Sequence, residues 1–262
     1  MKSLRMDRDA DGVQVLRSEL LLEAGFLNAF STAVGPDGSV FDVSAPDAER
    51  GAVPPAVRTA NLVRFDRMFP ASHGVSTIRQ VHGVDVVFVA DGSAPGDALV
   101  ETRPDRVVGV RTADCVPVLI ADPGTGVVAA VHAGWRGLVA DVIGRTIDRL
   151  GELVDDPSRL IAAIGPAIGP EAFEIGPEVA ERFIEADLAD VVLQDHPRPH
   201  ADLHRATRIR LSAAGIEPGR IDGEPLCTHD DARFFSFRRS GQAAGSHLAA
   251  IQAGSTTELM PR

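Results

Sequence analysis

The chain has 262 residues, of which 44% are apolar and 24% charged, as in an ordinary globular protein with one large or two small domains. Its formal net charge of −11 argues against a nucleic-acid partner, although a local arginine cluster can still bind a small phosphate. No apolar run reaches the roughly 18 residues of a membrane span, and the N-terminus does not resemble a secretory signal. We therefore expect a soluble cytoplasmic protein, with no membrane association, whose two cysteines, Cys115 and Cys227, do not form a disulfide.

The first half of the chain predicts a loop, a helix and a series of strands. Both ends are polar and weakly patterned, so we expect residues 1–12 and 254–262 to be loose. Proline and glycine are frequent over 35–55, which predicts an irregular loop before a helix over 56–68. Runs rich in β-branched residues, with a hairpin turn at DPGTG, then predict strands over 76–78, 84–89, 107–110, 116–121 and 127–131.

The second half alternates irregularly between helices and strands. Apolar spacing predicts helices over 138–153, 177–189 and 203–214. Buried strands are expected over 161–164, 221–227 and 233–237. No break in composition marks a domain boundary, so we predict a single domain over 1–262 of α/β or α+β type, with a mixed sheet.

Three short islands, RQVHG, RTADCVPVLIAD and VHAGWRG, each supply one metal-ligand side chain where an apolar strand meets small residues: His82, Cys115 and His132. Their separations, 32 and 16 intervening residues, match no zinc-finger spacing and indicate ligands that converge from separate elements. Three protein ligands leave a fourth position for water or substrate, which is typical of a catalytic zinc site.

The other histidines offer weaker signals. His196, His200 and His204 lie in PRPHADLH, where two prolines disfavour a helical metal motif, so we interpret this segment as a solvated loop. His229 in CTHDD is interpreted mainly as the end of a strand, and its nearness to FFSFRR keeps it as a segment that could support the site.

Together with IGPAIGPEAFEIG and CTHDDARFFSFRR, the three islands resemble the bacterial laccase-domain, or polyphenol oxidoreductase, family. Members of that family are zinc-dependent purine nucleoside phosphorylases with adenosine deaminase and methylthioadenosine phosphorylase activity. The resemblance covers about residues 25–250. It implies a layered sandwich of mixed β-sheet with flanking helices, distantly similar to cytotoxic necrotizing factor deamidases, and zinc held by His82, Cys115 and His132.

The chain departs from the family pattern at several positions. Ala33 stands where the GFSTRxGG motif has a basic residue, and Ser246 replaces the arginine of a Gly-Arg pair. GPCCYEVG appears here as GPEAFEIG, so its cysteines and tyrosine are missing while Glu174 remains. The two lost basic residues mean that phosphate would have to be bound by other side chains.

The resemblance implies phosphorolysis of adenosine or inosine, with purine nucleoside and phosphate as partners, by a monomer or homodimer. Guanidinium groups match phosphate oxygens, and we therefore expect Arg136 above all, and also Arg79, Arg238 or Arg239, to bind phosphate or substrate. Glu174 is a candidate acid/base group, and Asp114, next to Cys115, is a candidate for orienting a ligand imidazole.

Three alternatives use the same residues. A metal-free cysteine hydrolase would employ Cys115 as nucleophile and His132 as base, and would not need His82. A copper-dependent polyphenol oxidase could use a His₂Cys set, but none of the four methionines adjoins the islands to provide an axial ligand. A binding module with an inert zinc site is the third.

Overall fold

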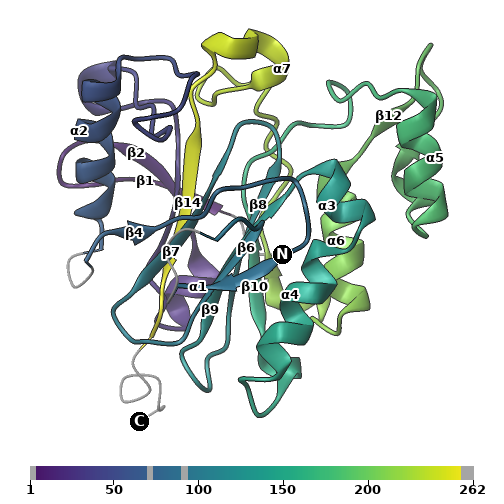
Figure 1. The fold of residues 1–262 in the computed structure, drawn as a ribbon, viewed down its shortest axis with the longest axis horizontal. Coiled ribbons are helices and arrows are strands. Elements are labelled where there is room, and N and C mark those ends of the chain that lie inside the picture. Colours follow the sequence, from purple (N-terminus) through teal and green to yellow (C-terminus); the bar gives the residue numbers. More distant parts are fainter. Residues whose placement is uncertain (1–3, 70–72, 90–93, 255–262) are drawn as a thin grey trace.

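The structure is a computed structural model, and it describes residues 4–69, 73–89 and 94–254. Two six-stranded mixed sheets form its centre, and helices cover their outer faces (Figure 1). The predicted mixed α/β sandwich is therefore confirmed. None of the helices in the described ranges is long and apolar enough to cross a membrane.

The first sheet has the strand order β1-β2-β3-β14-β7-β4. It joins the two ends of the chain, because β14 pairs antiparallel with both β3 and β7. Its strands are β1 (Leu4–Arg8), β2 (Gln14–Ser18), β3 (Asn28–Ser31), β14 (His247–Gln252), β7 (Val107–Thr112) and β4 (Val75–Ser76).

The second sheet has the order β13-β10-β8-β9-β6-β5. Its central pair, β8 and β9, is the antiparallel hairpin predicted from DPGTG. Its strands are β13 (Ile221–Asp222), β10 (Ile161–Ile164), β8 (Val116–Ala121), β9 (Val128–Ala133), β6 (Ala98–Glu101) and β5 (Val86–Phe88). A separate two-stranded ribbon pairs β11 (Val192–Leu193) with β12 (His200–Ala201).

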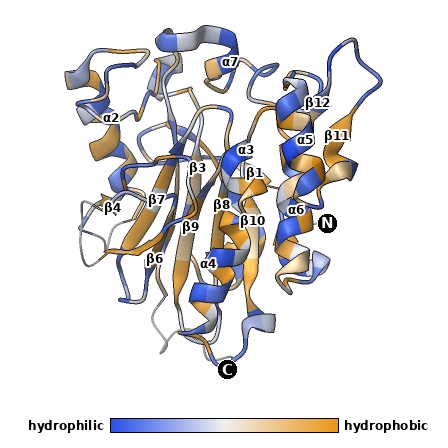
Figure 2. Ribbon diagram, turned by 45° about the vertical axis from the view of Figure 1, so that its right-hand side comes forward, coloured by the Kyte–Doolittle hydropathy of each residue, from blue (hydrophilic) through white to orange (hydrophobic). Residues whose placement is uncertain are grey.

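Successive residues of a strand point to opposite faces, and in β8 both faces are buried. Val118 and Ile120 pack toward the helices, whereas Leu119 and Ala121 pack into the apolar layer between the two sheets. This double burial explains why VPVLIA is an uninterrupted apolar run. Figure 2 shows the same concentration of hydrophobic residues along the central strands.

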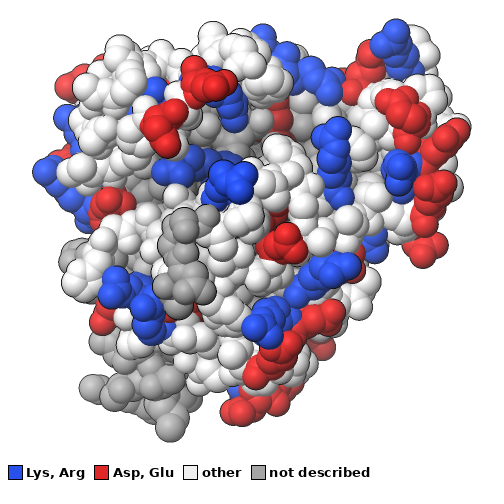
Figure 3. Space-filling view, in the orientation of Figure 1, with Lys and Arg blue, Asp and Glu red and all other residues white. Residues whose placement is uncertain are grey.

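Helices cover both outer faces. The face of the second sheet is covered by α3 (Trp135–Val139), α4 (Val142–Gly151) and α6 (Leu203–Ala213), while α2 (Pro55–Asp66) covers the first sheet. The remaining helices are α1 (Glu19–Glu23), α5 (Pro177–Glu185) and α7 (Phe237–Ser240). Charge is distributed unevenly: acidic residues gather at the right-hand edge, near α5, and basic residues at the upper middle (Figure 3).

Several expectations about local structure are wrong. Residues 4–8, expected to be loose, form β1, and the helix expected over 138–153 is interrupted at Asp141, which has φ 63° and caps α4 through Gly144 N–H. The strand expected over 233–237 is a turn that leads into α7. Most of the predicted C-terminal tail lies outside the described residues.

The segment expected to be a solvated loop around PRPHADLH is also different. His200 lies in β12 and His204 in the first turn of α6, and both side chains are buried. The Asp202 side chain accepts a hydrogen bond from Arg205 N–H and so begins the helix there. The strand expected over 221–227 ends at Asp222, although Cys227 forms an isolated bridge with Ala167.

Candidate metal centre

The structure brings His82, Cys115 and His132 together at one end of the second sheet. Their ligand atoms all lie within 4.8 Å of one another. Cys115 immediately precedes β8 and His132 lies in β9, so strand pairing places the two side by side. His82 comes from the turn before β5, and its Nε2 is 3.9 Å from Cys115 Sγ.

The three side chains fit a metal ion. A tetrahedral zinc would hold such ligands about 3.4–3.6 Å apart, so a shift of a few tenths of an ångström closes the 3.9 Å between His82 Nε2 and Cys115 Sγ. A shift of about 1 Å at most is needed across the whole group, whose ligand atoms lie within 4.8 Å of one another. Gly134 provides the room: a Cβ at this position would lie 3.1 Å from both Cys115 Sγ and His82 Cδ2. Gly134, two residues after His132, therefore has a steric purpose, and one thiolate with two imidazoles suits a borderline divalent ion.

Asp97, which the sequence analysis missed, supports both histidines. Its carboxylate is fully buried, and Oδ1 accepts a hydrogen bond of 2.7 Å from His132 Nδ1, which leaves Nε2 free to face the site. The same carboxylate accepts the backbone N–H groups of Val81, His82 and Gly83 at 3.3, 3.0 and 2.6 Å. It therefore stabilises a turn in which His82 has a φ of 59°.

The protein groups shift one another's protonation. Burial raises the pKa of the Cys115 thiol, but the His132 and His82 imidazoles outweigh it and lower that pKa to about 6. Burial lowers the pKa of His132, yet Cys115 and Asp97 raise it to about 9. For Asp97, burial raises the pKa, but the hydrogen bonds from His132 and Gly83 outweigh this effect and hold the pKa below its usual value, so the carboxyl stays ionised. The arrangement favours a thiolate, the form that binds metals.

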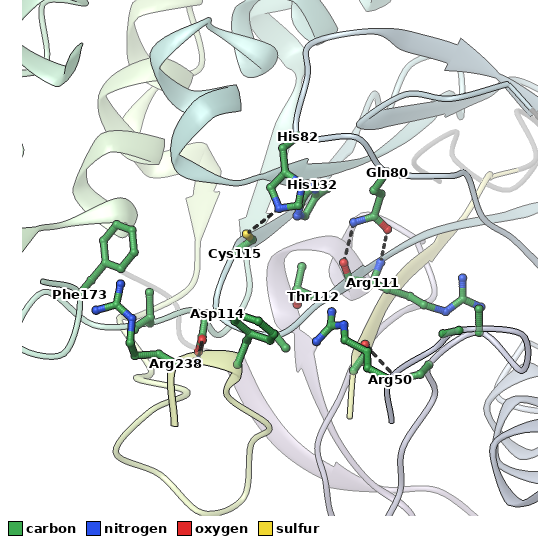
Figure 4. A pocket seen from close by; sticks show the side chains of 17 residues that line it. Arg50, Gln80, His82, Arg111, Thr112, Asp114, Cys115, His132, Phe173 and Arg238 are labelled. Atoms are coloured by element: carbon green, nitrogen blue, oxygen red, sulfur yellow. Dashed lines mark hydrogen bonds between the residues drawn. The ribbon is translucent and has the colours of Figure 1, made fainter. Parts of the chain in front are cut away.

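The three side chains lie in a cavity of about 500 Å³. Two further groups of residues surround them (Figure 4). The apolar lining includes Ile168, Phe173 and Phe237, and the basic lining consists of Arg50, Arg111 and Arg238. A volume of this size is sufficient for a ligand as large as a nucleoside.

Asp114 lines the cavity but does not contact an imidazole. Its Oδ1 accepts the Thr228 hydroxyl at 2.7 Å and its Oδ2 accepts Arg238 N–H at 2.7 Å. Asp114 thus ties CTHDD and α7 to the start of β8, whereas the carboxylate that accepts a hydrogen bond from a candidate ligand imidazole is that of Asp97. Both cysteines are free, as predicted, and Cys227 Sγ accepts a hydrogen bond from Gly169 N–H.

Of the four arginines expected to bind phosphate or substrate, Arg238 lines the cavity. Its guanidinium donates to the carbonyl oxygens of Ala172 and Glu174 and lies 5.2 Å from the centre of the Phe173 ring. The Glu174 side chain does not line the cavity and pairs instead with Arg198 at 2.9 Å. Its position does not support the expected acid/base role.

The other expected arginines lie outside the cavity lining. Arg136 is exposed and stacks on Trp135 at 4.4 Å, because the inward side of α3 is taken by Gly137 and Leu138. Arg79 is exposed beside Pro95. Arg239 donates to the carbonyl oxygens of Thr228, His229 and Phe234 and so holds the turn before α7 together.

The basic residues that the sequence analysis missed are Arg50 and Arg111. Arg50 lies in the segment interpreted only as an irregular loop, between Asp47, Glu49 and Gly51, and such a charged stretch gives no signal of burial. Arg111 was part of an island, but it ends a strand of the first sheet, and the sequence does not show that this sheet reaches the site.

Comparison with known proteins identifies relatives of this chain. A family model described as "Multi-copper polyphenol oxidoreductase laccase" matches residues 48–254. A relative named "Purine nucleoside phosphorylase", from Deinococcus radiodurans, is 36% identical over 245 residues, which are 92% of this chain and 94% of the relative. "Adenosine deaminase RL5", from an unknown prokaryotic organism, is 39% identical over 163 residues, or 59% of this chain and 61% of the relative.

The fold also matches a solved structure. The crystal structure of YlmD from Geobacillus stearothermophilus superposes with a TM-score of 0.80 at 26% sequence identity, over 96% of this chain and 100% of that one. The match of the family model over most of the chain, with the agreement in fold, shows that this protein belongs to the polyphenol oxidoreductase laccase family.

Proposed function

We propose that this protein is a zinc-dependent purine nucleoside phosphorylase, which converts adenosine or inosine and phosphate into free base and ribose 1-phosphate. The observation that carries the proposal is the His82, Cys115 and His132 cluster inside a nucleoside-sized cavity with both aromatic and basic walls. The names of the relatives support the same substrate class.

In phosphorolysis a phosphate oxygen forms a bond to C1′ of the ribose while the bond from C1′ to the purine nitrogen breaks. The electron pair leaves with the base, which then takes up a proton. Zinc held by the three side chains would supply Lewis acidity beside the reacting atoms. The remaining task of the protein is to position the two substrates and to stabilise the charge that develops.

The residues of the cavity suit these tasks. Phe173 presents an aromatic face on which a purine can stack, and Arg238 lies beside that ring. Asp97 holds the His132 ring in one orientation, and Asp114 fixes the position of Arg238 through its backbone. Arg136, Arg79 and Glu174 are not assigned a role in this mechanism, because they lie outside the cavity lining.

Adenosine deamination and methylthioadenosine phosphorolysis are proposed as accompanying activities of the same cavity. Deamination needs water and a polarising group but no phosphate, so one site can carry both reactions. The relative named as an adenosine deaminase is the observation that favours it.

The site geometry supports two of the alternative functions less well than it supports the zinc enzyme. A metal-free cysteine hydrolase would also exploit the lowered pKa of Cys115, but it gives no reason for His82 to lie 3.9 Å from the sulfur. A blue-copper oxidase usually has a long axial ligand such as methionine, and no methionine is among the described residues that line the cavity.

The test combines metal analysis with product analysis. Purified protein should contain one zinc per chain, and it should release adenine or hypoxanthine with ribose 1-phosphate only when phosphate is present. Inosine formed from adenosine without phosphate would show the deaminase activity. Protein that holds no zinc, or that never releases base in the presence of phosphate, would overturn the proposal. Turnover without zinc that iodoacetamide abolishes would favour the cysteine hydrolase.

A further inference from the structure

The wall of the cavity that faces away from Phe173 is formed by residues 44–52, here called the Arg50 loop, and by the end of β7. Figure 4 shows Arg50 and Arg111 on one side of the three candidate metal ligands, and Phe173 and Arg238 on the other. The cavity therefore has two basic ends, and at each of them an arginine lies over an aromatic ring: Arg238 over Phe173, and Arg50 over Phe237.

The buried guanidinium of Arg58 holds the Arg50 loop in place through hydrogen bonds. Arg58, on α2, is 4% exposed, and its guanidinium donates to the carbonyl oxygens of Ala45, Pro46, Ala48 and Arg50 at 2.9–3.2 Å. Four carbonyl oxygens that converge on one guanidinium fix the path of an otherwise irregular segment. The loop is thus preorganised.

A buried carboxylate fixes both ends of this wall. Asp42 accepts the backbone N–H groups of Ser44, Ala52 and Ser246, and also the Ser44 hydroxyl. The hydroxyl oxygens of Ser44 and Ser246 lie 3.1 Å apart, and both residues line the cavity. Two hydroxyl groups are consequently placed beside the two arginines.

Arg50 is the cation of this wall that has no anionic partner among the described residues. No carboxylate of the described residues forms an ion pair with it, and its Nη1 is buried without a hydrogen-bond partner. Its guanidinium lies 5.3 Å from the centre of the Phe237 ring. Arg111, in contrast, donates to Val43 O and Thr77 Oγ1. Arg50 lines the cavity with a charge that no carboxylate of the described residues neutralises, so an anion in the cavity would compensate that charge.

We propose that Arg50, together with Arg111 and the hydroxyl groups of Ser44 and Ser246, forms the subsite that binds the phosphate cosubstrate. The purine base then lies at the Phe173 end, and the ribose lies between them over the three candidate metal ligands. This assignment rests on the proposed phosphorylase function. It also explains how a chain with Ala33 and Ser246 at the positions of two family basic residues keeps a cation for phosphate.

The test is the binding of inorganic phosphate to the zinc-loaded protein, measured by calorimetry. Arg50→Ala should raise the dissociation constant for phosphate by about tenfold or more, since a charge-assisted contact is lost. Arg50→Lys should raise it less, because the charge remains without the planar donor pair. Arg145→Ala, which removes an exposed arginine on α4, should leave it unchanged, and zinc content should be equal in all four proteins.

Steady-state kinetics separate this subsite from the proposed function. The KM for phosphate should rise in Arg50→Ala while the KM for the nucleoside changes little. If the wild-type protein performs phosphorolysis and Arg50→Ala binds phosphate as the wild type does, the subsite is wrong and the function stands. If phosphate binds through Arg50 but no base is ever released, the subsite stands and the function is wrong. A wild-type protein that binds no phosphate overturns the subsite.

Discussion

The floor and the walls of the cavity are built in different ways. The floor consists of His82, Cys115 and His132, with the buried Asp97 behind them. Its shape follows from backbone pairing: β8 with β9, and the His132 N–H with the Asp97 carbonyl oxygen. The walls come from segments far apart in the sequence, and side chains such as Arg58 and Asp42 hold these segments through carbonyl oxygens and N–H groups.

This difference separates two functions. Strand pairing is the most reproducible part of a fold, so the floor can hold a metal in a fixed geometry. Loops can change without disturbing the sheets, so the walls are where substrate preference is set. Substitutions in the floor should therefore change metal binding, and substitutions in the walls should change substrate binding while the metal stays.

The largest effect is expected from Cys115→Ser, which removes the thiolate of the floor. Zinc affinity should fall by at least about a hundredfold, because a ligand contributes more than the supporting groups whose loss costs 10–100-fold. Titration with a competing chelator measures the affinity. A Cys115→Ser protein that keeps its full zinc content would show that the metal is held elsewhere.

Asp97→Asn tests whether the floor depends on its supporting carboxylate. The amide keeps the shape but weakens the acceptor for His132 Nδ1 and for the turn at His82. Zinc affinity should fall about 10–100-fold. Asp114→Asn is the matched control, because that carboxylate contacts Thr228 and Arg238 and no candidate ligand. Equal losses in the two variants would contradict the assignment of Asp97.

Phe173→Ala addresses the wall alone. Stacking of a base on an aromatic ring is worth about 1–3 kcal/mol, so the KM for the nucleoside should rise between about 5-fold and 150-fold. Zinc content and the KM for phosphate should stay the same. Phe173→Tyr, which introduces the tyrosine of the family motif GPCCYEVG and keeps the aromatic ring, should behave like the wild type. An unchanged nucleoside KM in Phe173→Ala would show that the base does not bind at the Phe173 end of the cavity.

The smallest effect concerns stability and pH. Burial lowers the pKa of His247 to about 4 from 6.5, and its Nε2 accepts the backbone N–H of Phe235, in the turn that leads to Phe237 and Arg238. Because the unfolded chain binds the proton more readily, the stabilisation is complete above pH 6.5 and is lost as the pH falls toward 4.

His247→Gln keeps an acceptor for Phe235 N–H but cannot be protonated. The difference in free energy of unfolding between pH 7 and pH 4.5 should shrink by about 1–3 kcal/mol relative to the wild type, as measured by urea denaturation of metal-free protein. His73→Gln, at an exposed position, serves as control. An unchanged pH dependence in His247→Gln would show that this imidazole is not the acid-sensitive group.

The sequence predicted the floor well and the walls poorly, for a physical reason. His82, Cys115 and His132 stand next to strands with strong apolar patterns, and a short hairpin such as DPGTG leaves one way to pair β8 with β9. No apolar pattern surrounds Arg50 in the sequence. Its position depends on a hydrogen bond from Arg58, and Arg58 lies on α2, a helix for which the sequence predicts only an apolar face and an exposed face.

The errors in the fold have the same origin. The strand β1 at Leu4–Arg8 alternates weakly and is stabilised by pairing with β2, a contact that local composition does not reveal. The sequence analysis missed Asp97 because Gly-Asp before an apolar run is typical of an exposed turn. In the structure the Asp97 carboxylate is buried, and it accepts hydrogen bonds from backbone N–H groups of a segment about 15 residues earlier. Its partners are close in space only after β5 and β6 pair.

The buried carboxylate of Asp97 also affects which charge of a bound metal ion would neutralise the site. With the histidines neutral, as metal ligands must be, the Cys115 thiolate and the fully buried Asp97 carboxylate together carry two negative charges. A divalent cation brings this cluster to electrical neutrality, while a monovalent cation such as Cu⁺ leaves a net negative charge and a trivalent one a net positive charge. The same side chain that shapes the turn at His82 thus adds a negative charge that would favour a divalent ion.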